Sequence, residues 1–352
     1  MSNIITNLLK NIDYTVPIFC IKAMAFITGF FIISTIIANL YIALYSFIFA
    51  RKYGYRTKFI SLFGLVFTKI KNKWVKIIYQ PSPLCLYIPT IDSDNIKPDY
   101  YLMEKKLSAS EKYSKLIISI IIFALTLKPI VAFFNGESLN LTEWFLIGFS
   151  TGMIFHSINH ILIHNYIYNK LYKGILGYIH DKSKLLIKDE SFANLDLKPL
   201  EELPYKSPSE LEKILYYLFY YYYLLALNKK EGMEKGSHEI TNMLWNRKLN
   251  LIYYQAYYWL IFYYSEIEID KEKADVFFRK IEPVICNDED SNAKRILAYY
   301  YYKLYNDSEK AKTLIEEGLS VIDKYAFGAD RNLEKELLVK LKNEIETKRL
   351  IS

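Results

Sequence analysis

The sequence predicts a mainly α-helical protein in which a polytopic membrane domain, with about three spans and a small β insert, precedes a soluble α-helical repeat domain. Long apolar runs fill the first half, whereas aromatic and charged residues alternate at short intervals in the second half. A chain of 352 residues, of which 52% are hydrophobic, has room for about two domains. We place the membrane domain at residues 1–170, a linker at 171–206 and the cytoplasmic helical-repeat domain at 207–352.

The first apolar run extends from Pro17 to Ala50, and its only charged residue is Lys22. A bilayer core of ~30 Å is crossed by about 20 apolar residues in a helix, so this run is longer than one span requires. Two spans would need a tight turn, for which the run contains no Pro-Gly signal. We therefore favour one span within residues 15–50 and keep two spans as the alternative.

Two further apolar runs predict a second span at Ser114–Phe134 and a third at Leu141–Tyr168, joined by the short connection Asn135–Asn140. Lys and Arg gather in the long segment 51–113 and are absent from the short connection. By the positive-inside rule, the N-terminus lies outside, and the long segment and the C-terminal half lie in the cytoplasm. The net charge of +7 therefore predicts contact with the lipid bilayer rather than with nucleic acid. Abundant Ile, Lys, Tyr and Asn are compatible with an AT-rich bacterial genome, so we expect a bacterial cytoplasmic membrane.

Within the segment 51–113, alternating apolar and basic residues predict a β-hairpin. Its arms are Leu65–Ile70 and Trp74–Tyr79, with the turn at Lys71-Asn72-Lys73, and Leu84–Ile88 is a candidate further strand. Two interpretations of this insert stay open. It is either a basic surface that lies on anionic lipid or a sheet edge that receives a peptide.

The end of the first apolar run, Asn39–Tyr55, closes a hydrophobic helix, meets water at Phe49-Ala50-Arg51-Lys52 and breaks at Gly54. This stretch resembles the first core helix of the site-2-protease family, the intramembrane zinc peptidases. The resemblance extends over residues 15–170 and rests on the helix exit, the β insert and the order of the spans.

Superimposing the helix exit on that of the family assigns three residues to its zinc-binding His-Glu-x-x-His motif: Ile42, Ala43 and Ser46. Phe63-Gly64 matches the start of the family's β insert. The resemblance implies that the scaffold is kept and that the catalytic motif is degenerate.

The third span contains three histidines, His156, His160 and His164. Residues four apart share a helix face, so His156 and His160 can chelate zinc, whereas residues eight apart are separated by about 12 Å along the axis. Asn159 matches an asparagine of this helix in the resembling family, but no Asp-Gly follows to complete a zinc site. Three interpretations stay open: a zinc or haem site, a polar or proton-responsive seam, and plain packing.

Three aromatic helices are predicted in the second half, at Leu215–Leu227, Tyr253–Tyr264 and Leu297–Tyr305. A Glu-Lys-small triplet follows each, and the triplets are 38 and 37 residues apart, close to the period of a helix-turn-helix solenoid. The triplets are Glu234-Lys235-Gly236, Glu272-Lys273-Ala274 and Glu309-Lys310-Ala311. The pattern resembles tetratricopeptide repeats, with a concave surface for a peptide and with Asn332–Lys348 as a capping helix.

Three functional hypotheses follow. The first is a noncatalytic site-2-protease-like membrane protein that binds a peptide or protein partner, in peptide processing, export, immunity or signalling. The second is an active intramembrane zinc metallopeptidase whose site is rebuilt around His156 and His160. The third is a membrane-anchored helical-repeat scaffold. Under the first and third hypotheses, we expect no catalytic residue and no cofactor. Only the second hypothesis requires bound zinc.

Overall fold

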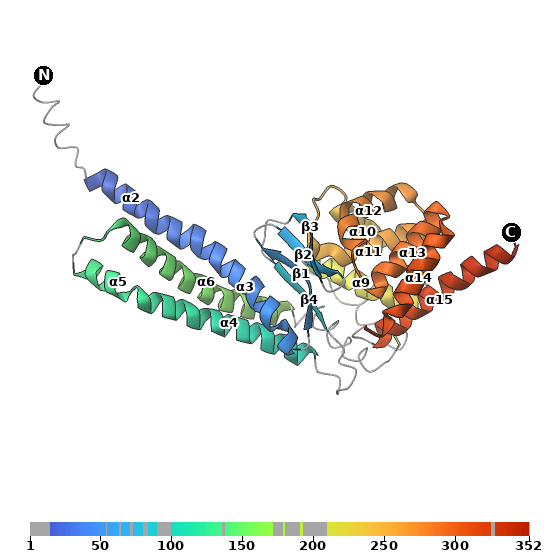
Figure 1. Ribbon diagram of the computed structural model, residues 1–352, viewed down its shortest axis with the longest axis horizontal. Helices are drawn as coiled ribbons and strands as arrows, with labels where there is room; N and C mark the ends of the chain where they lie inside the picture. Colours follow the sequence, from blue (N-terminus) through green and yellow to red (C-terminus); the bar gives the residue numbers. More distant parts are fainter. Residues whose placement is uncertain are drawn as a thin grey trace, which may run out of the picture. The chain divides into compact units, whose positions relative to one another are not determined.

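The computed structural model describes residues 15–53, 55–62, 65–70, 73–79, 84–89, 100–135, 138–171, 179, 191–192, 210–324 and 328–351 (Figure 1). They form two compact units. The apolar helical unit comprises the described residues within 1–53, 83–85 and 102–167, and the C-terminal unit those within 54–82, 86–101 and 168–352. The chain therefore enters the C-terminal unit three times, and the first two segments contain most of the β-strand residues that we placed within residues 1–170.

One continuous helix opens the apolar helical unit. It comprises α2 (Thr15–Ile27), a π-helical turn η1 (Thr28–Ile33) and α3 (Ser34–Phe49), and it ends in the 3-10 turn η2 (Ala50–Tyr53). The residues at the junctions, Ile27, Ile33 and Ala50, keep right-handed helical backbone angles. The first apolar run is therefore one helix rather than two, and it ends at Phe49 as predicted.

Three helices complete this unit: α4 (Tyr100–Leu125), α5 (Leu127–Phe134) and α6 (Leu141–Leu171). The turn at Thr126 separates α4 from α5, because Pro129 has no N–H to donate to the carbonyl of Leu125. The predicted span Ser114–Phe134 is therefore two helices. Helix α4 also begins 14 residues before Ser114, inside the segment that we predicted to be a loop.

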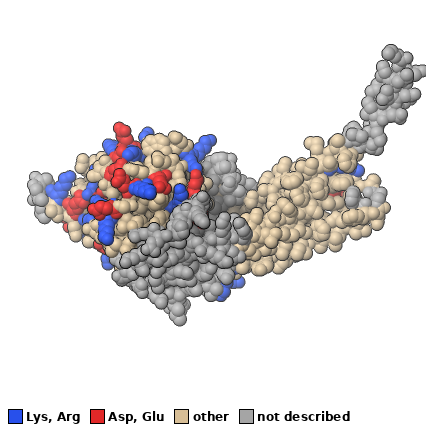
Figure 2. Space-filling model, turned by 180° about the vertical axis from the view of Figure 1, so that it is seen from behind, with Lys and Arg blue, Asp and Glu red and all other residues tan. Residues whose placement is uncertain are grey.

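Two helices of the described chain are long and apolar enough to cross a membrane, Ile18–Tyr53 and Leu141–Ile163. Few of their apolar side chains are covered by other parts of the protein: Phe19, Met24 and Phe31 are 65%, 67% and 59% exposed. Figure 2 shows charged residues gathered over the C-terminal helices and nearly absent from the visible surface of the apolar helices. Exposing such an apolar surface to water is unfavourable, whereas contact of the same surface with lipid tails is favourable.

Glycines allow the backbone of α6 to pack directly against the backbone of the first helix. A Cβ atom added to Gly29 would lie 2.5 Å from the carbonyl oxygen of Phe145, and one added to Gly152 would lie 2.5 Å from that of Phe30. Gly148 and Gly152 form a Gly-x-x-x-Gly pattern, which permits close helix packing in lipid. This contact fixes the register of the two apolar helices.

The four strands form one sheet in the order β3-β2-β1-β4: β1 (Tyr55–Leu62), β2 (Leu65–Ile70), β3 (Lys73–Tyr79) and β4 (Leu84–Pro89). The predicted hairpin is confirmed, because β2 and β3 pair antiparallel from Leu65 opposite Tyr79 to Ile70 opposite Lys73. Strand β1, which the sequence did not predict, pairs antiparallel with β2. Phe63-Gly64 lies outside the described residues.

The remaining regular elements of the described C-terminal unit are helices. The bounds are α9 (Glu210–Ala226), α10 (Glu234–Leu244), α11 (Tyr254–Phe262), α12 (Lys271–Ile285), α13 (Ser291–Tyr305), α14 (Ser308–Ser320) and α15 (Gly328–Ile351), with short turns η4 (Leu251–Tyr253), η5 (Tyr263–Ile267) and η6 (Ile322–Lys324). The three predicted aromatic helices correspond to α9, to α11 with η5, and to α13, and they pack on α10, α12 and α14 respectively.

Each Glu-Lys-small triplet lies in the first turn of the second helix of such a pair, and its small residue is buried. Ala274 and Ala311 are fully covered, and a Cβ atom on Gly236 would lie 1.9 Å from the hydroxyl oxygen of Tyr221. Asp270 and Asp307 precede α12 and α14, and each accepts a hydrogen bond from a backbone N–H three residues on. The triplet therefore marks a helix start packed tightly on the preceding helix.

A buried lysine joins the sheet to the helices of the C-terminal unit. Lys58 of β1 lies 2.7 Å from Asp288 and 2.6 Å from Asp290, both just before α13. Its ammonium also lies 5.1 Å from the ring centre of Tyr254, and Phe59 packs edge-on against the same ring. The pKa of Lys58 is raised because attraction to the two carboxylates outweighs the opposing effect of burial.

Candidate functional site

A carboxylate, a hydroxyl and an imidazole meet inside the apolar helical unit. Ser46 of α3 donates a 3.2 Å hydrogen bond to Oε2 of Glu111 on α4, and Nε2 of His160 on α6 lies 3.8 Å from Oε1 of the same residue. Glu111 and Ser46 are 8% and 4% exposed, so the carboxylate is largely removed from solvent. All three helices therefore contribute to one polar centre.

Two of the residues predicted from the sequence thus come together, but only through Glu111. Ser46 stands at the last position of the degenerate zinc motif, and His160 belongs to the histidine pair of the third predicted span. Ala43 is buried, whereas Ile42 and Asn159 are half-buried, and the Asn159 amide makes no hydrogen bond within the described structure.

His156 has a different partner from His160. Its Nε2 lies 2.8 Å from the hydroxyl of Thr35 on α3, and its ring packs edge-on against Phe155. Among the described residues, no group of three or more His, Cys, Asp or Glu is placed to hold a metal ion. Because protein zinc sites use three or four ligands, His160 with Glu111 provides fewer than such a site requires.

Hydroxyl groups extend this polar seam along the three helices. The remaining contacts are Tyr41 with Ser114 at 2.8 Å, Tyr45 with Ser110 at 2.5 Å, Ser119 with Ser157 at 2.8 Å and Thr126 with Ser150 at 2.9 Å. Interhelical hydrogen bonds of this kind are worth about 0.6 kcal/mol each in lipid. The seam orients the helices and keeps polar groups away from the exposed apolar surface.

In the C-terminal unit, the final helix lies against the face shared by the first helices of the pairs. Glu334 of α15 accepts hydrogen bonds from Arg295 of α13 at 2.5 and 3.1 Å and from Tyr222 of α9 at 3.4 Å. Farther along α15, Tyr299 donates to the carbonyl of Leu337 at 3.0 Å. Part of the surface of α9 and α13 is therefore covered by the protein's own last helix.

Arg295 is the centre of this contact. It is 2% exposed, and its guanidinium carbon lies 4.5 Å from the ring centre of Phe262 on α11. Its pKa is raised because attraction to Glu334 outweighs the opposing effect of burial. Asp330, one turn before Glu334, is desolvated and repelled by that carboxylate, and its pKa is raised to about 7.

No protein-family model, curated protein or solved structure matches this chain.

Sequence reasoning missed Glu111. It lies in Ser108-Ala-Ser-Glu-Lys112, a stretch whose charges are typical of a solvated loop. In the structure, α4 begins early enough to carry Glu111 between α3 and α6. His238, which carries no motif in the sequence, also has a carboxylate partner, with its Nε2 2.6 Å from Oε2 of Glu268.

Proposed function

We propose that this protein is a noncatalytic, site-2-protease-like membrane protein whose C-terminal helical unit binds a peptide or protein partner. The observation that carries the proposal is the contrast between its surfaces. Two long helices expose large apolar side chains, whereas the C-terminal unit has a buried aromatic core and a charged exterior (Figure 2). In this proposal the helices cross a bacterial cytoplasmic membrane, with the N-terminus outside and the C-terminal unit in the cytoplasm.

The polar centre supports a structural role rather than catalysis. At the three motif positions, Ile42 and Ala43 carry no group that binds a metal or a proton, and the hydroxyl of Ser46 is engaged by Glu111. A metallopeptidase needs a metal-activated water and a base beside it. In our proposal, the seam holds three helices together and the work of the protein is done by binding.

Carbonate extraction and vesicle flotation test the membrane part of the proposal. We expect the full chain to stay in the membrane pellet at alkaline pH and to float with vesicles, because moving the exposed side chains of its apolar helices into water is unfavourable. Recovery of a soluble, monodisperse chain without detergent would contradict it. For the partner, site-specific photo-crosslinking from the C-terminal unit of the membrane-embedded chain should give one discrete adduct, with a crosslinker on the sheet as the comparison.

The second candidate is the zinc metallopeptidase, which one observation favours. Glu111 provides a carboxylate beside His160, and the sequence had offered none in the apolar core. Against it, the described residues offer no third ligand.

Metal content decides between the two candidates. We expect the detergent-purified protein to contain far less than one zinc or iron per chain, and to contain the same amount after His156→Ala/His160→Ala substitution. Stoichiometric metal that the double substitution removes, together with cleavage of a membrane peptide that a chelator abolishes, would establish the metallopeptidase instead.

A further inference from the structure

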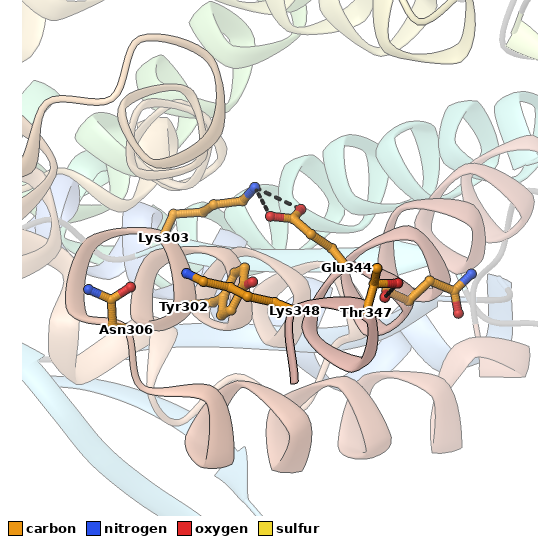
Figure 3. A pocket seen from close by; sticks show the side chains of 7 residues that line it. Tyr302, Lys303, Asn306, Glu344, Thr347 and Lys348 are labelled. Carbon is orange, nitrogen blue, oxygen red and sulfur yellow. Dashed lines mark hydrogen bonds and ion pairs between the residues drawn. The ribbon is translucent and has the colours of Figure 1, made fainter. Parts of the chain in front are cut away.

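An open recess of about 780 Å³ lies between the end of α13 and the second half of α15 (Figure 3). Its volume is within the range of ligand pockets, ~300–1,000 Å³. Tyr302, Lys303 and Asn306 line it from the α13 side, and Glu344 and Lys348 line it from α15. It is distinct from the covered contact around Arg295, which lies one to two turns earlier on the same helix.

The tyrosine of this recess has an unused hydrogen-bonding group. Tyr302 is 5% exposed, and its hydroxyl has no hydrogen-bond partner among the residues that the structure describes. A buried phenol normally finds a partner, because leaving one unsatisfied costs about 1–3 kcal/mol. Figure 3 shows the side chain of Lys348 lying across this ring, and its ammonium is 5.7 Å from the ring centre.

Most polar groups in the open part of the recess are hydrogen-bond donors that have no acceptor within the described chain. Lys303 is occupied, with its ammonium 2.7 and 2.8 Å from the two carboxylate oxygens of Glu344 (Figure 3) and 3.2 Å from Glu266. Lys348 has no carboxylate partner in the described chain, and the amide of Asn306 makes no hydrogen bond there. A hydroxyl, an ammonium and an amide are thus left for a ligand that accepts hydrogen bonds and carries negative charge.

We propose that this recess binds an acidic side chain of a partner polypeptide, with its carboxylate held by Lys348 and by the hydroxyl of Tyr302. On binding, the Lys348 ammonium turns away from the ring of Tyr302 and toward the carboxylate of the partner. This movement uncovers the Tyr302 hydroxyl. The side-chain amide of Asn306 then donates a hydrogen bond to the peptide beside the bound carboxylate. The choice of a polypeptide rests on the proposed function, whereas the choice of a carboxylate rests on the unused donors alone.

Fluorescence anisotropy of the full chain in dodecyl maltoside tests the proposal. The probe is a fluorescein-labelled hexapeptide of alternating Ala and Glu with an amidated C-terminus, and the matched peptide has Gln in place of Glu. We expect saturable binding of the Glu peptide and binding of the Gln peptide weaker by about tenfold, since charge-assisted hydrogen bonds are the strong ones. Lys348→Gln should weaken binding of the Glu peptide by about tenfold, and Tyr302→Phe by about fivefold.

Two controls separate this site from general attraction to a basic protein and from unfolding. Lys342→Gln removes the same charge from the exposed surface of α15, outside the recess, and should change binding by less than about twofold. Tyr302→Phe should leave the melting temperature unchanged or higher, because it deletes a group that is not hydrogen-bonded.

Several outcomes overturn the proposal: no saturable binding at millimolar peptide, equal binding of the Gln peptide, equal weakening by Lys342→Gln, or a fall in melting temperature with Tyr302→Phe. Competition by free glutamate as effective as by the hexapeptide would reassign the recess to a small-molecule carboxylate and overturn the polypeptide part. None of these outcomes affects the flotation test, so failure here is distinguishable from failure of the proposed function.

Discussion

Gly148 lies where α6 touches the first helix, and we predict that methyl groups added at this contact separate the two helices. A Cβ atom at residue 148 would lie 2.3 Å from the carbonyl oxygen of Phe26 and 2.9 Å from its Cα. Ordinary C···O contacts between helices are about 3.3 Å, so the contact must open by about 1 Å. Because the opposing atoms belong to the backbone, no change of side-chain rotamer relieves the overlap.

The expected loss is the difference between two opposing effects. Overpacking costs about 1–3 kcal/mol per site, and alanine is more favourable than glycine in a helix by about 1 kcal/mol. With about 2 kcal/mol for each overlap and two substitutions, we expect the Gly148→Ala/Gly152→Ala protein to be less stable by about 2 kcal/mol. The single Gly148→Ala protein should lose about half as much, about 1 kcal/mol.

A ¹⁹F NMR titration with sodium dodecyl sulfate measures this loss in each unit separately. In protein labelled with 5-fluorotryptophan, Trp144 reports on the apolar helical unit, because its ring packs edge-on against Phe26 at 6.4 Å between centroids. Trp259, which stacks on Tyr221 at 4.5 Å, reports on the C-terminal unit and should not respond. Leu146→Ala, on the exposed side of α6, is the control substitution. An unchanged Trp144 transition in the double variant would refute this account of the contact.

Three further predictions concern the C-terminal unit. Arg295→Met removes the cation paired with the fully buried carboxylate of Glu334 and should lower the free energy of unfolding by about 3–5 kcal/mol in urea titrations. Arg295→Met/Glu334→Leu should be more stable than the single variant, and the reverse order would contradict a buried ion pair. Lys58→Met leaves the buried Asp288 and the half-buried Asp290 without their shared cation and should lower the urea midpoint, while Lys76→Met, exposed on the same sheet, should not. Equal effects of the two substitutions would mean that the pairing of Lys58 contributes nothing to stability. Asp330 has a pKa raised to about 7, above the unfolded value of about 4, so the wild type should lose stability as the pH rises from about 4 to about 7. The Asp330→Asn protein should therefore have a higher melting temperature than the wild type at pH 8 and a similar one at pH 4. A difference in melting temperature that stays constant across this pH range would rule out the titration of Asp330 as its cause.

Local patterns predicted most of the elements. Alternating apolar and basic residues located the hairpin of β2 and β3, and the Glu-Lys-small triplets located the starts of α10, α12 and α14. These predictions succeeded because the pairing residues of a hairpin and the neighbours on a helix face are close in the sequence. Strand β1 was missed because its Lys58, read alone, is typical of a solvated loop, whereas its carboxylate partners lie about 230 residues away.

The centre of the apolar helical unit was predicted only in part. Ser46 and His160 were singled out from the sequence, but the residue that connects them was not. Glu111 is 65 residues from Ser46 in the chain, and nothing in its local sequence distinguishes a buried carboxylate from a solvated one. The same limit applies to α15: the sequence predicted a capping helix at 332–348, but its contact with α9 depends on how the intervening helices pack.

The sequence by itself determined which segments are apolar and where most of the helices lie, because helix and strand periods act over a few residues. It did not determine the early start of α4 or its separation from α5. Only the tertiary structure decided which charges are buried and what each one faces: Glu111 with Ser46, Lys58 with two aspartates, Arg295 with Glu334. A buried charge is tolerated only beside a partner brought from elsewhere in the fold. That partner is set by the packing of helices and strands, which no local pattern specifies.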